Sequence, residues 1–467
     1  MEAGFMEDRR RILKATRSLA GFVHDLQISD ISQQVVDHTI RVIRDTLGAM
    51  LAGATLPEVK GLAAQAPVLG GSGQSTLMGR KEGTSAHFAA LVNGTGAVSL
   101  ELDEGNQYAI NHPGVHLFPA AFALAEDQRT SGTELLTAFL AGYEVAVRVG
   151  RATHLREAVH PFGTHAIVGT AAVASRLLGL DVDETVQALN LAAGICIASS
   201  QTAANAGASV RNVATGLTNH NGLLAPILVR SGFTGEPGAF DVVFGKILGD
   251  SFRDEGLGDD LDQEFYITRN YFKLHACSRW NHAPIEAMAR LLSRKPLKPE
   301  DVERITVWTY DPATRLSWSN PVNGYAGKHS IPYNVAVRLV LGHNDLEAYS
   351  EGAVSNPQVQ EVSRRVVVRE DPKLTAMLPD LRPARVEVKL KDGRKLTETV
   401  ERPPGGFDNP YTEEELVNKF RRLAGMTLPG PSVNALEKML PNLPELEDMT
   451  RVSALLRGQK LSIEQKS

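Results

Sequence analysis

The sequence has very little cysteine: its 467 residues include only Cys196 and Cys277. Two thiols cannot build a disulfide framework, and they are too few for a zinc site made of cysteines. Long apolar runs are also missing, since the run at 223–229 is far shorter than the roughly 20 residues of a membrane-spanning helix. Residues 1–14 alternate acidic and basic side chains without an apolar stretch. We therefore expect a cytoplasmic protein in a reducing compartment, with no membrane segment.

An excess of charge of one sign is missing as well. The chain has 49 basic and 54 acidic residues, a net charge of −5. Such a balance lacks the positive field with which nucleic-acid-binding proteins attract phosphate, so no nucleic-acid partner is expected. The length exceeds the roughly 100–200 residues of one domain, which predicts two or three domains. Neither a dinucleotide-binding glycine motif nor a P-loop occurs.

Helical spacing dominates the first 255 residues. In residues 35–51, apolar side chains recur every three or four positions, which is the period of an amphipathic helix. We expect Asn93-Gly94 to break the next helix, and Ser131 and Glu134 to form a capping box at the start of another. Further helices are predicted at 163–180, from Asp181 or Asp183 to about 197, and at 213–230, with no convincing strand among them.

Strand patterns appear only later in the chain. Residues 302–310 and 364–369 are rich in β-branched side chains, and the alternation at 385–390 continues through Asp392-Gly393 into 395–400, a strong hairpin signal. Helix then returns, with Thr412 and Glu415 as a capping box. The predicted fold is therefore mainly α. It comprises a large all-helical domain of residues 1–268 and 406–467 and a smaller α+β lid domain of residues 269–405.

Acidic side chains crowd a loop between two apolar helices. Glu101, Asp103 and Glu104 are followed by His112. Loops held by rigid helices often carry functional side chains, so this loop is a candidate catalytic segment. The alternative is a solvated acidic loop without chemistry.

Two later segments carry further candidates. His160 precedes a helix of small residues, where the helix start would lower its pKa and keep the ring neutral for acid–base work. Lys273 follows Tyr271-Phe272 at the predicted domain junction, where burial would lower its pKa and let it act as a base. The alternatives are a buried histidine bonded to backbone and a surface lysine lying along apolar side chains.

Arg211 and Tyr143 are candidate site residues, but each also has an ordinary structural explanation. Arg211 precedes the helix predicted at 213–230 and could clamp a carboxylate, or it could be a surface arginine. Tyr143 lies in an apolar helix as an acid–base group or as part of the core. A metal site is not expected, because His112 and His116 are four apart but separated by Pro113-Gly114.

Taken in order, these segments resemble the MmgE/PrpD family. The resemblance covers about residues 15–455, and it implies a homodimer, an active site between a helical domain and an α+β lid, and no metal or organic cofactor. The motifs that carry it are Asn93-Gly94, Leu100-Glu101-Leu102-Asp103-Glu104, His112-Pro113-Gly114, Pro119-Ala120-Ala121, Ala141-Gly142-Tyr143-Glu144-Val145, His160-Pro161 with Gly163-Thr164, Leu177-Leu178-Gly179-Leu180-Asp181, Gly232-Phe233-Thr234-Gly235, the Lys273 segment, His329-Ser330-Ile331-Pro332-Tyr333, and Asn409-Pro410 with Lys419-Phe420.

The resemblance also implies roles for single residues. Five positions match family motifs as catalytic candidates: Lys273, His112, Tyr143, His160 and Glu101. Substrate-binding candidates are Arg211, Asp103 and Ser278. Arg211 stands where the decarboxylases of the family carry lysine, and Ser278 where they carry histidine. These departures speak against decarboxylation of cis-aconitate and leave α-proton abstraction intact.

The family's known reactions share carbanion chemistry beside a carboxylate. The resemblance therefore implies a cofactor-independent lyase that acts on a small polycarboxylate, with dehydration of a 2-methylcitrate-like tricarboxylate as the first expectation. The alternatives are an epimerase of a dicarboxylic amino-acid derivative such as iminodisuccinate, a cis-aconitate-type decarboxylase and an inactive paralogue. Which of Lys273, Tyr143 and His112 is base and which is acid stays open, as does the stereochemistry.

Overall fold

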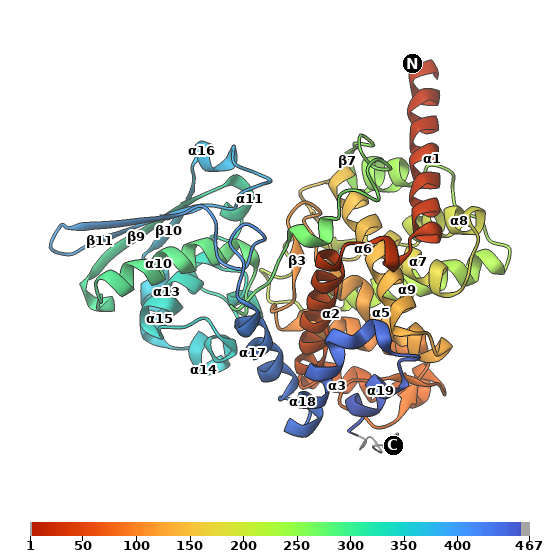
Figure 1. Cartoon of the computed structure of the whole chain (residues 1–467). Helices are drawn as coiled ribbons and strands as arrows, with labels where there is room; N and C mark the ends of the chain where they lie inside the picture. The colour runs from red at the N-terminus through yellow and green to blue at the C-terminus, as the bar shows by residue number, and fades with distance from the viewer. Residues whose placement is uncertain (1, 459–467) are drawn as a thin grey trace.

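Helices form most of the molecule, whose structure is a computed structural model that describes residues 2–458. One lobe is built almost entirely of them (Figure 1). Its helices are α1 (Glu2–Asp25), α2 (Gln33–Gly53), α3 (Pro57–Ala63), α4 (Ala86–Ser99), α5 (Pro113–Gln128), α6 (Gly132–Ala152), α7 (Ala166–Leu177), α8 (Val182–Gly194), α9 (Val210–Arg230), α17 (Glu413–Ala424), α18 (Gly430–Met439) and α19 (Thr450–Leu456). None of the described helices is both long and apolar enough to cross a bilayer.

The other lobe carries the main sheet, whose strand order is β10-β9-β11-β12 (Figure 1). β10 (Val366–Glu370) runs parallel to β9 (Val302–Thr309), and β11 (Ala384–Leu390) is antiparallel to both β9 and β12 (Lys395–Val400). The helices of this lobe are α10 (His282–Arg294), α11 (Asp311–Thr314), α12 (Gly324–Gly327), α13 (Ile331–Val340), α14 (Glu351–Val354), α15 (Pro357–Arg364) and α16 (Pro372–Thr375). The prediction of a mainly α fold with a smaller α+β part is confirmed.

Several local predictions are also confirmed. Asp392-Gly393 joins β11 to β12, with Gly393 at φ 87°, and Thr412 and Glu415 form a capping box at the start of α17. Asp181 is the N-cap of α8. Of the capping box expected at Ser131 and Glu134, only one half is present: Ser131 accepts a hydrogen bond from the backbone N–H of Glu134, while the Glu134 carboxylate binds Arg176 instead.

The expected helix break at Asn93-Gly94 was wrong, because α4 runs straight through both residues. A Cβ atom on Gly94 would lie 2.6 Å from Nδ2 of Asn219 in α9, so glycine permits the close approach of the two helices. The buried Asn93 side chain accepts a hydrogen bond from the backbone N–H of Met78 and donates one to the carbonyl of Thr76. The pair therefore serves packing inside a helix rather than ending it.

Short strands in the helical lobe were not expected. They are two to four residues long, too short for an alternating pattern, and comprise β1 (Ser75–Thr76), β2 (Gly83–Thr84), β3 (Gly105–Asn106), β4 (Thr153–Leu155), β5 (Val159–His160), β6 (Ser199–Ser200), β7 (Gly249–Phe252) and β8 (Asn270–Tyr271). Two of them tie the lobes together. β8 lies where the chain first passes from one lobe to the other, and it pairs with β3 of the acidic loop. Tyr271 in β8 also forms a β-bridge with Gly406, which lies where the chain passes back. The acidic loop thus lies where the chain passes from one lobe to the other, while the domain limits at 268 and 405 stay a prediction.

Candidate active site

A cavity of about 400 Å³ lies beside the acidic loop. Its walls come from both lobes, since they include the acidic loop, β5 and the start of α9 together with lid segments around 278–280, 310–316 and 378–382. Five of the predicted site residues line it: Glu101, His112, His160, Arg211 and Ser278. Side chains from distant parts of the chain therefore meet in one partly open cavity.

Glu101 lies at the turn that leads out of α4. Its φ of 56° is in the left-handed region that non-glycine residues rarely adopt. The carboxylate is buried and accepts a hydrogen bond from Nη1 of Arg211, with Nζ of Lys273 3.4 Å from its other oxygen. Burial raises the pKa of Glu101, but the charges of Arg211 and Lys273 outweigh it and hold that pKa well below the ordinary value. Glu101 is therefore an anion with two cationic partners.

Asp103 and His112 form a second pair. The distance from Nδ1 of His112 to Oδ2 of Asp103 is 2.5 Å, and Nε2 of the same ring lies 3.2 Å from the hydroxyl of Tyr271. Burial lowers the pKa of His112, although Asp103 opposes the shift. Burial raises the pKa of Asp103, while Lys273 and His112 together bring it below its ordinary value. The arrangement is a neutral imidazole that donates from Nδ1 to Asp103 and offers Nε2 as a base.

Lys273 differs from the sequence prediction in two respects. It does not line the cavity, because its side chain is completely buried behind Glu101 and Asp103, with Nζ 3.4 Å from a carboxylate oxygen of each. Burial alone lowers the pKa of Lys273, but the two carboxylates raise it above its ordinary value. The predicted depressed pKa was therefore wrong, and Lys273 is a fixed ammonium ion rather than a neutral base.

Arg211 and His160 lie side by side in the cavity wall. Arg211 lies in the first turn of α9, which starts earlier than predicted, and its guanidinium stacks 4.0 Å from the ring centroid of Phe162. Its Nε is 3.1 Å from Nε2 of His160. Burial and the charge of Arg211 lower the pKa of His160 well below its ordinary value. A neutral ring was predicted, but the expected cause was wrong, since His160 lies in β5 and not at the start of α7.

The remaining candidates lie at the edge of the site or behind it. Ser278 lines the cavity, and its backbone N–H donates to the carbonyl of Lys328 at 3.0 Å. Tyr143 is not a cavity residue: its buried hydroxyl donates to Oε2 of Glu104 at 3.1 Å. Burial raises the pKa of Glu104 to about 8, so this carboxyl group is largely protonated at neutral pH. Tyr143 and Glu104 thus form a polar pair beneath the site.

Several residues in or beside the cavity were not proposed from the sequence. Tyr271 was noted only as an aromatic neighbour of Lys273, although its hydroxyl contacts His112. Tyr325 does not line the cavity, but its hydroxyl donates to Oδ1 of Asn212 at 3.0 Å and lies 3.1 Å from Nη1 of Arg211. His329 was quoted as part of a motif without a role, and burial lowers its pKa to about 4. No local pattern marks these side chains, because they are brought to the site by lid segments far along the chain.

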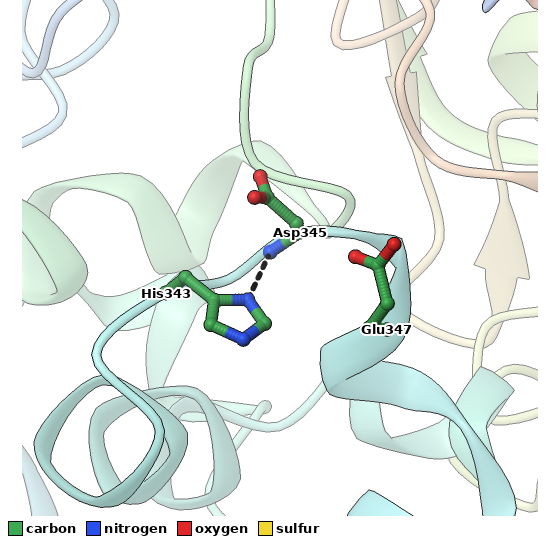
Figure 2. A group of neighbouring side chains, drawn as sticks. All are labelled: His343, Asp345 and Glu347. Carbon is green, nitrogen blue, oxygen red and sulfur yellow. Dashed lines mark hydrogen bonds between the residues drawn. The ribbon is translucent and has the colours of Figure 1, made fainter.

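A potential metal-ligand group lies elsewhere. Among the described residues, His343, Asp345 and Glu347 have ligand atoms within 4.8 Å of one another. Figure 2 shows the three side chains on one turn of the lid lobe, where the backbone N–H of Asp345 donates to Nδ1 of His343 at 3.4 Å. Asp345 also pairs with Arg422 at 3.7 Å, and none of the three lines the cavity. The expectation of metal-independent chemistry stays a prediction.

Comparisons with known proteins cover most of the chain. A family model of the MmgE/PrpD N-terminal domain matches residues 17–248, and one of the MmgE/PrpD C-terminal domain matches residues 275–442. The cis-aconitate decarboxylase of Homo sapiens is 28% identical over 471 residues, which cover 95% of this chain and 94% of that protein. A cis-aconitate decarboxylase-like protein of Aspergillus oryzae is 27% identical and covers 95% of this chain and 97% of its own. The 2-methylcitrate dehydratase of Salmonella typhimurium is 24% identical over 54% of this chain and 56% of its own.

Proposed function

Because the chain belongs to the MmgE/PrpD family, we propose that it is a cofactor-independent lyase that removes an α-proton from a small polycarboxylate in the cavity between the lobes. The observation that carries this proposal is the hydrogen-bonded series Asp103–His112–Tyr271, which opens into that cavity. A carboxylate that fixes the tautomer of a neutral histidine is a common device for acid–base catalysis.

His112 is the proposed base. Asp103 accepts its Nδ1 proton, so Nε2 carries the lone pair, which accepts from the hydroxyl of Tyr271 until the substrate displaces that contact, and the charge of Asp103 would stabilise the imidazolium that forms. Lys273 is less suited to this role, since its ammonium ion has no lone pair to accept a proton and does not face the cavity. Its charge instead keeps Asp103 and Glu101 ionised.

Carboxylate recognition is supported by the arginines around the cavity. Five arginine side chains line it. Guanidinium groups bind carboxylates through paired hydrogen bonds and stabilise the enediolate-like charge that develops when an α-proton leaves. A small polycarboxylate satisfies both the charge and the size of this space.

The reaction we propose first is dehydration of a 2-methylcitrate-like tricarboxylate. Nε2 of His112 takes the α-proton, the electron pair of the broken C–H bond forms the double bond, and the β-hydroxyl leaves. The protonated His112 can return its proton through Tyr271, so that the hydroxyl departs as water and the histidine is neutral again. One relay thus serves both steps.

Decarboxylation of a cis-aconitate-type substrate is the second candidate. One observation favours it: the decarboxylase relatives match 95% of this chain, whereas the dehydratase relative matches 54%. Arg211 and Ser278 speak against it, because the family resemblance places a lysine and a histidine there in decarboxylases. The epimerase alternative receives no support from these relatives.

The test is incubation with a panel of polycarboxylates in deuterated water, followed by NMR and by ultraviolet absorbance. Dehydration yields an alkene without gas, decarboxylation yields carbon dioxide, and an epimerase yields deuterium exchange with inversion. Absence of any reaction or exchange across the panel would contradict the proposal. A homodimer, which the family resemblance implies, is proposed too, and sedimentation of the purified protein tests it.

A further inference from the structure

The charges around the cavity do not balance. Among the residues that the structure describes, its lining includes five arginines and three carboxylate side chains. Three of the arginines are paired with those carboxylates: Arg211 with Glu101, Arg315 with Glu157 at 3.6 Å, and Arg156 with Asp250 at 3.5 Å. Two arginines of the lid lobe, Arg279 and Arg382, remain. Among the side chains described, those of residues 10–458, no carboxylate forms an ion pair with either of them.

Both unpaired arginines are buried and have hydrogen-bond donors left over. Arg279 is 5% exposed, Arg382 is 9% exposed, and the neighbouring Tyr310 is 2% exposed. In the described part of the chain, Nε of each arginine has no hydrogen-bond partner, and the O–H of Tyr310 has no acceptor, although Arg382 lies near enough to donate to the Tyr310 oxygen. Buried polar atoms in folded proteins are almost always satisfied, so three unpaired donors on one cavity wall call for an acceptor.

The protein holds these groups in place. Nη1 and Nη2 of Arg279 donate to the carbonyl oxygens of Pro404 and Pro403 at 2.6 and 2.9 Å, and Nη2 of Arg382 donates to the carbonyl of Gln107 at 3.0 Å. Burial lowers the pKa of Arg279, and the nearby charge of Arg382 lowers it further. Two buried cations that repel each other are costly unless an anion lies with them.

We propose that Arg279, Arg382 and Tyr310 form a carboxylate subsite that binds one carboxylate group of the substrate. The inference rests on the proposed function, because it takes the ligand to be the polycarboxylate that reacts. The guanidinium carbon of Arg279 lies 4.9 Å from the ring centroid of Tyr271, which contacts His112. A carboxylate held at this subsite therefore places the rest of the molecule beside the proposed base, and Arg211 is not needed as its anchor.

The test is a calorimetric titration with propane-1,2,3-tricarboxylate, which has no hydroxyl group to eliminate, so that binding is measured apart from turnover. The variants are Arg279→Gln and Arg382→Gln, with Arg290→Gln as the control, since Arg290 belongs to the same lobe, does not line the cavity and already pairs with Glu286 at 2.8 Å. Each of the first two should weaken binding about ten-fold or more, the usual effect of losing a charged hydrogen bond, and the control should not. Because Arg279 also holds Pro403 and Pro404, thermal unfolding and the Arg382→Gln variant guard against a folding defect.

Two dicarboxylates separate a defined subsite from a general positive field. Glutarate lacks the central carboxylate of the probe and methylsuccinate lacks a terminal one. The ligand that lacks the carboxylate bound by the arginines should bind the wild type and the variants with similar affinity. Equal losses for all three ligands, equal losses in the control, or unchanged affinity in both variants would overturn the subsite. If the wild type turns over polycarboxylates while the variants keep their affinity, only the subsite fails; if the wild type neither binds nor turns over, the proposed function fails as well.

Discussion

Replacement of Lys273 by methionine tests the electrostatics of the site. Methionine keeps most of the buried volume but removes the ammonium ion that lies 3.4 Å from both Glu101 and Asp103. Removing one partner of a buried ion pair costs about 3–5 kcal/mol, because the other charge is left buried without compensation. Glu101 keeps Arg211, and Asp103 keeps His112, so we expect the lower end of that range, about 3 kcal/mol.

The loss should depend on pH in a defined direction. In the wild type, the folded-state pKa values of Glu101 and Asp103 lie below their ordinary values. Their stabilisation is therefore complete above the unfolded-state pKa, about 4, and is lost as the pH falls through the folded-state values. In Lys273→Met both folded-state pKa values rise, so its deficit should be full at pH 7 and should shrink as the pH falls below about 5.

Urea unfolding of both proteins across this pH range measures the deficit. Lys389→Met serves as the control, since Lys389 is a partly exposed residue paired with Glu303, and its loss should cost less than about 1 kcal/mol. A Lys273→Met protein as stable as the wild type at pH 7 would refute the reasoning and would restore the neutral lysine suggested by the sequence. A deficit that stays constant from pH 7 to pH 4 would refute the assignment to the two carboxylates.

Three further predictions concern Arg211, Tyr143 and metal ions. Arg211→Lys keeps the charge but cannot reproduce both the Nε contact with His160 and the Nη1 contacts with Glu101 and Tyr325, so kcat/KM should fall by the equivalent of about 1–3 kcal/mol, and unchanged kinetics would show that these contacts are dispensable. Tyr143→Phe removes a hydrogen bond to Glu104 behind the cavity, so the free energy of unfolding should fall by about 1 kcal/mol with little effect on turnover; normal stability with lost turnover would make Tyr143 an acid–base residue after all. Prolonged chelation should leave activity unchanged, and recovery of a chelator-sensitive activity by one divalent ion would contradict metal independence.

Local signals in the sequence predicted local structure well. The hairpin at Asp392-Gly393 and the capping box of Thr412 and Glu415 depend only on neighbouring residues, and both are present. The predicted helix break at Asn93-Gly94 was wrong because the role of this pair depends on a distant part of the chain. Whether a glycine ends a helix or lets another helix approach depends on α9, which lies more than a hundred residues away.

The sequence predicted which residues form the candidate site better than it predicted their charge states. The resemblance to a family placed Glu101, Asp103, His112 and Arg211 in one site, and the structure brings them together with Lys273. The direction of the pKa shift of Lys273 could not be predicted, because it depends on how many carboxylates surround a buried Nζ in three dimensions. Arg279 lies in the Lys273 segment but received no role there, Arg382 lies in no quoted motif, and only the charge balance of the folded cavity singles the two out.

The central claim is that His112 takes the α-proton while Lys273 acts only through its charge. The most direct measurement is the rate of α-deuterium exchange into a reactive polycarboxylate, followed by NMR for the wild type, His112→Asn and Lys273→Arg. We predict that His112→Asn slows exchange by about 10²–10⁴-fold, the usual contribution of a positioned base, whereas Lys273→Arg keeps much of the rate because its charge is retained. Exchange that persists in a folded His112→Asn protein but vanishes in Lys273→Arg would contradict the claim and would make the lysine the base.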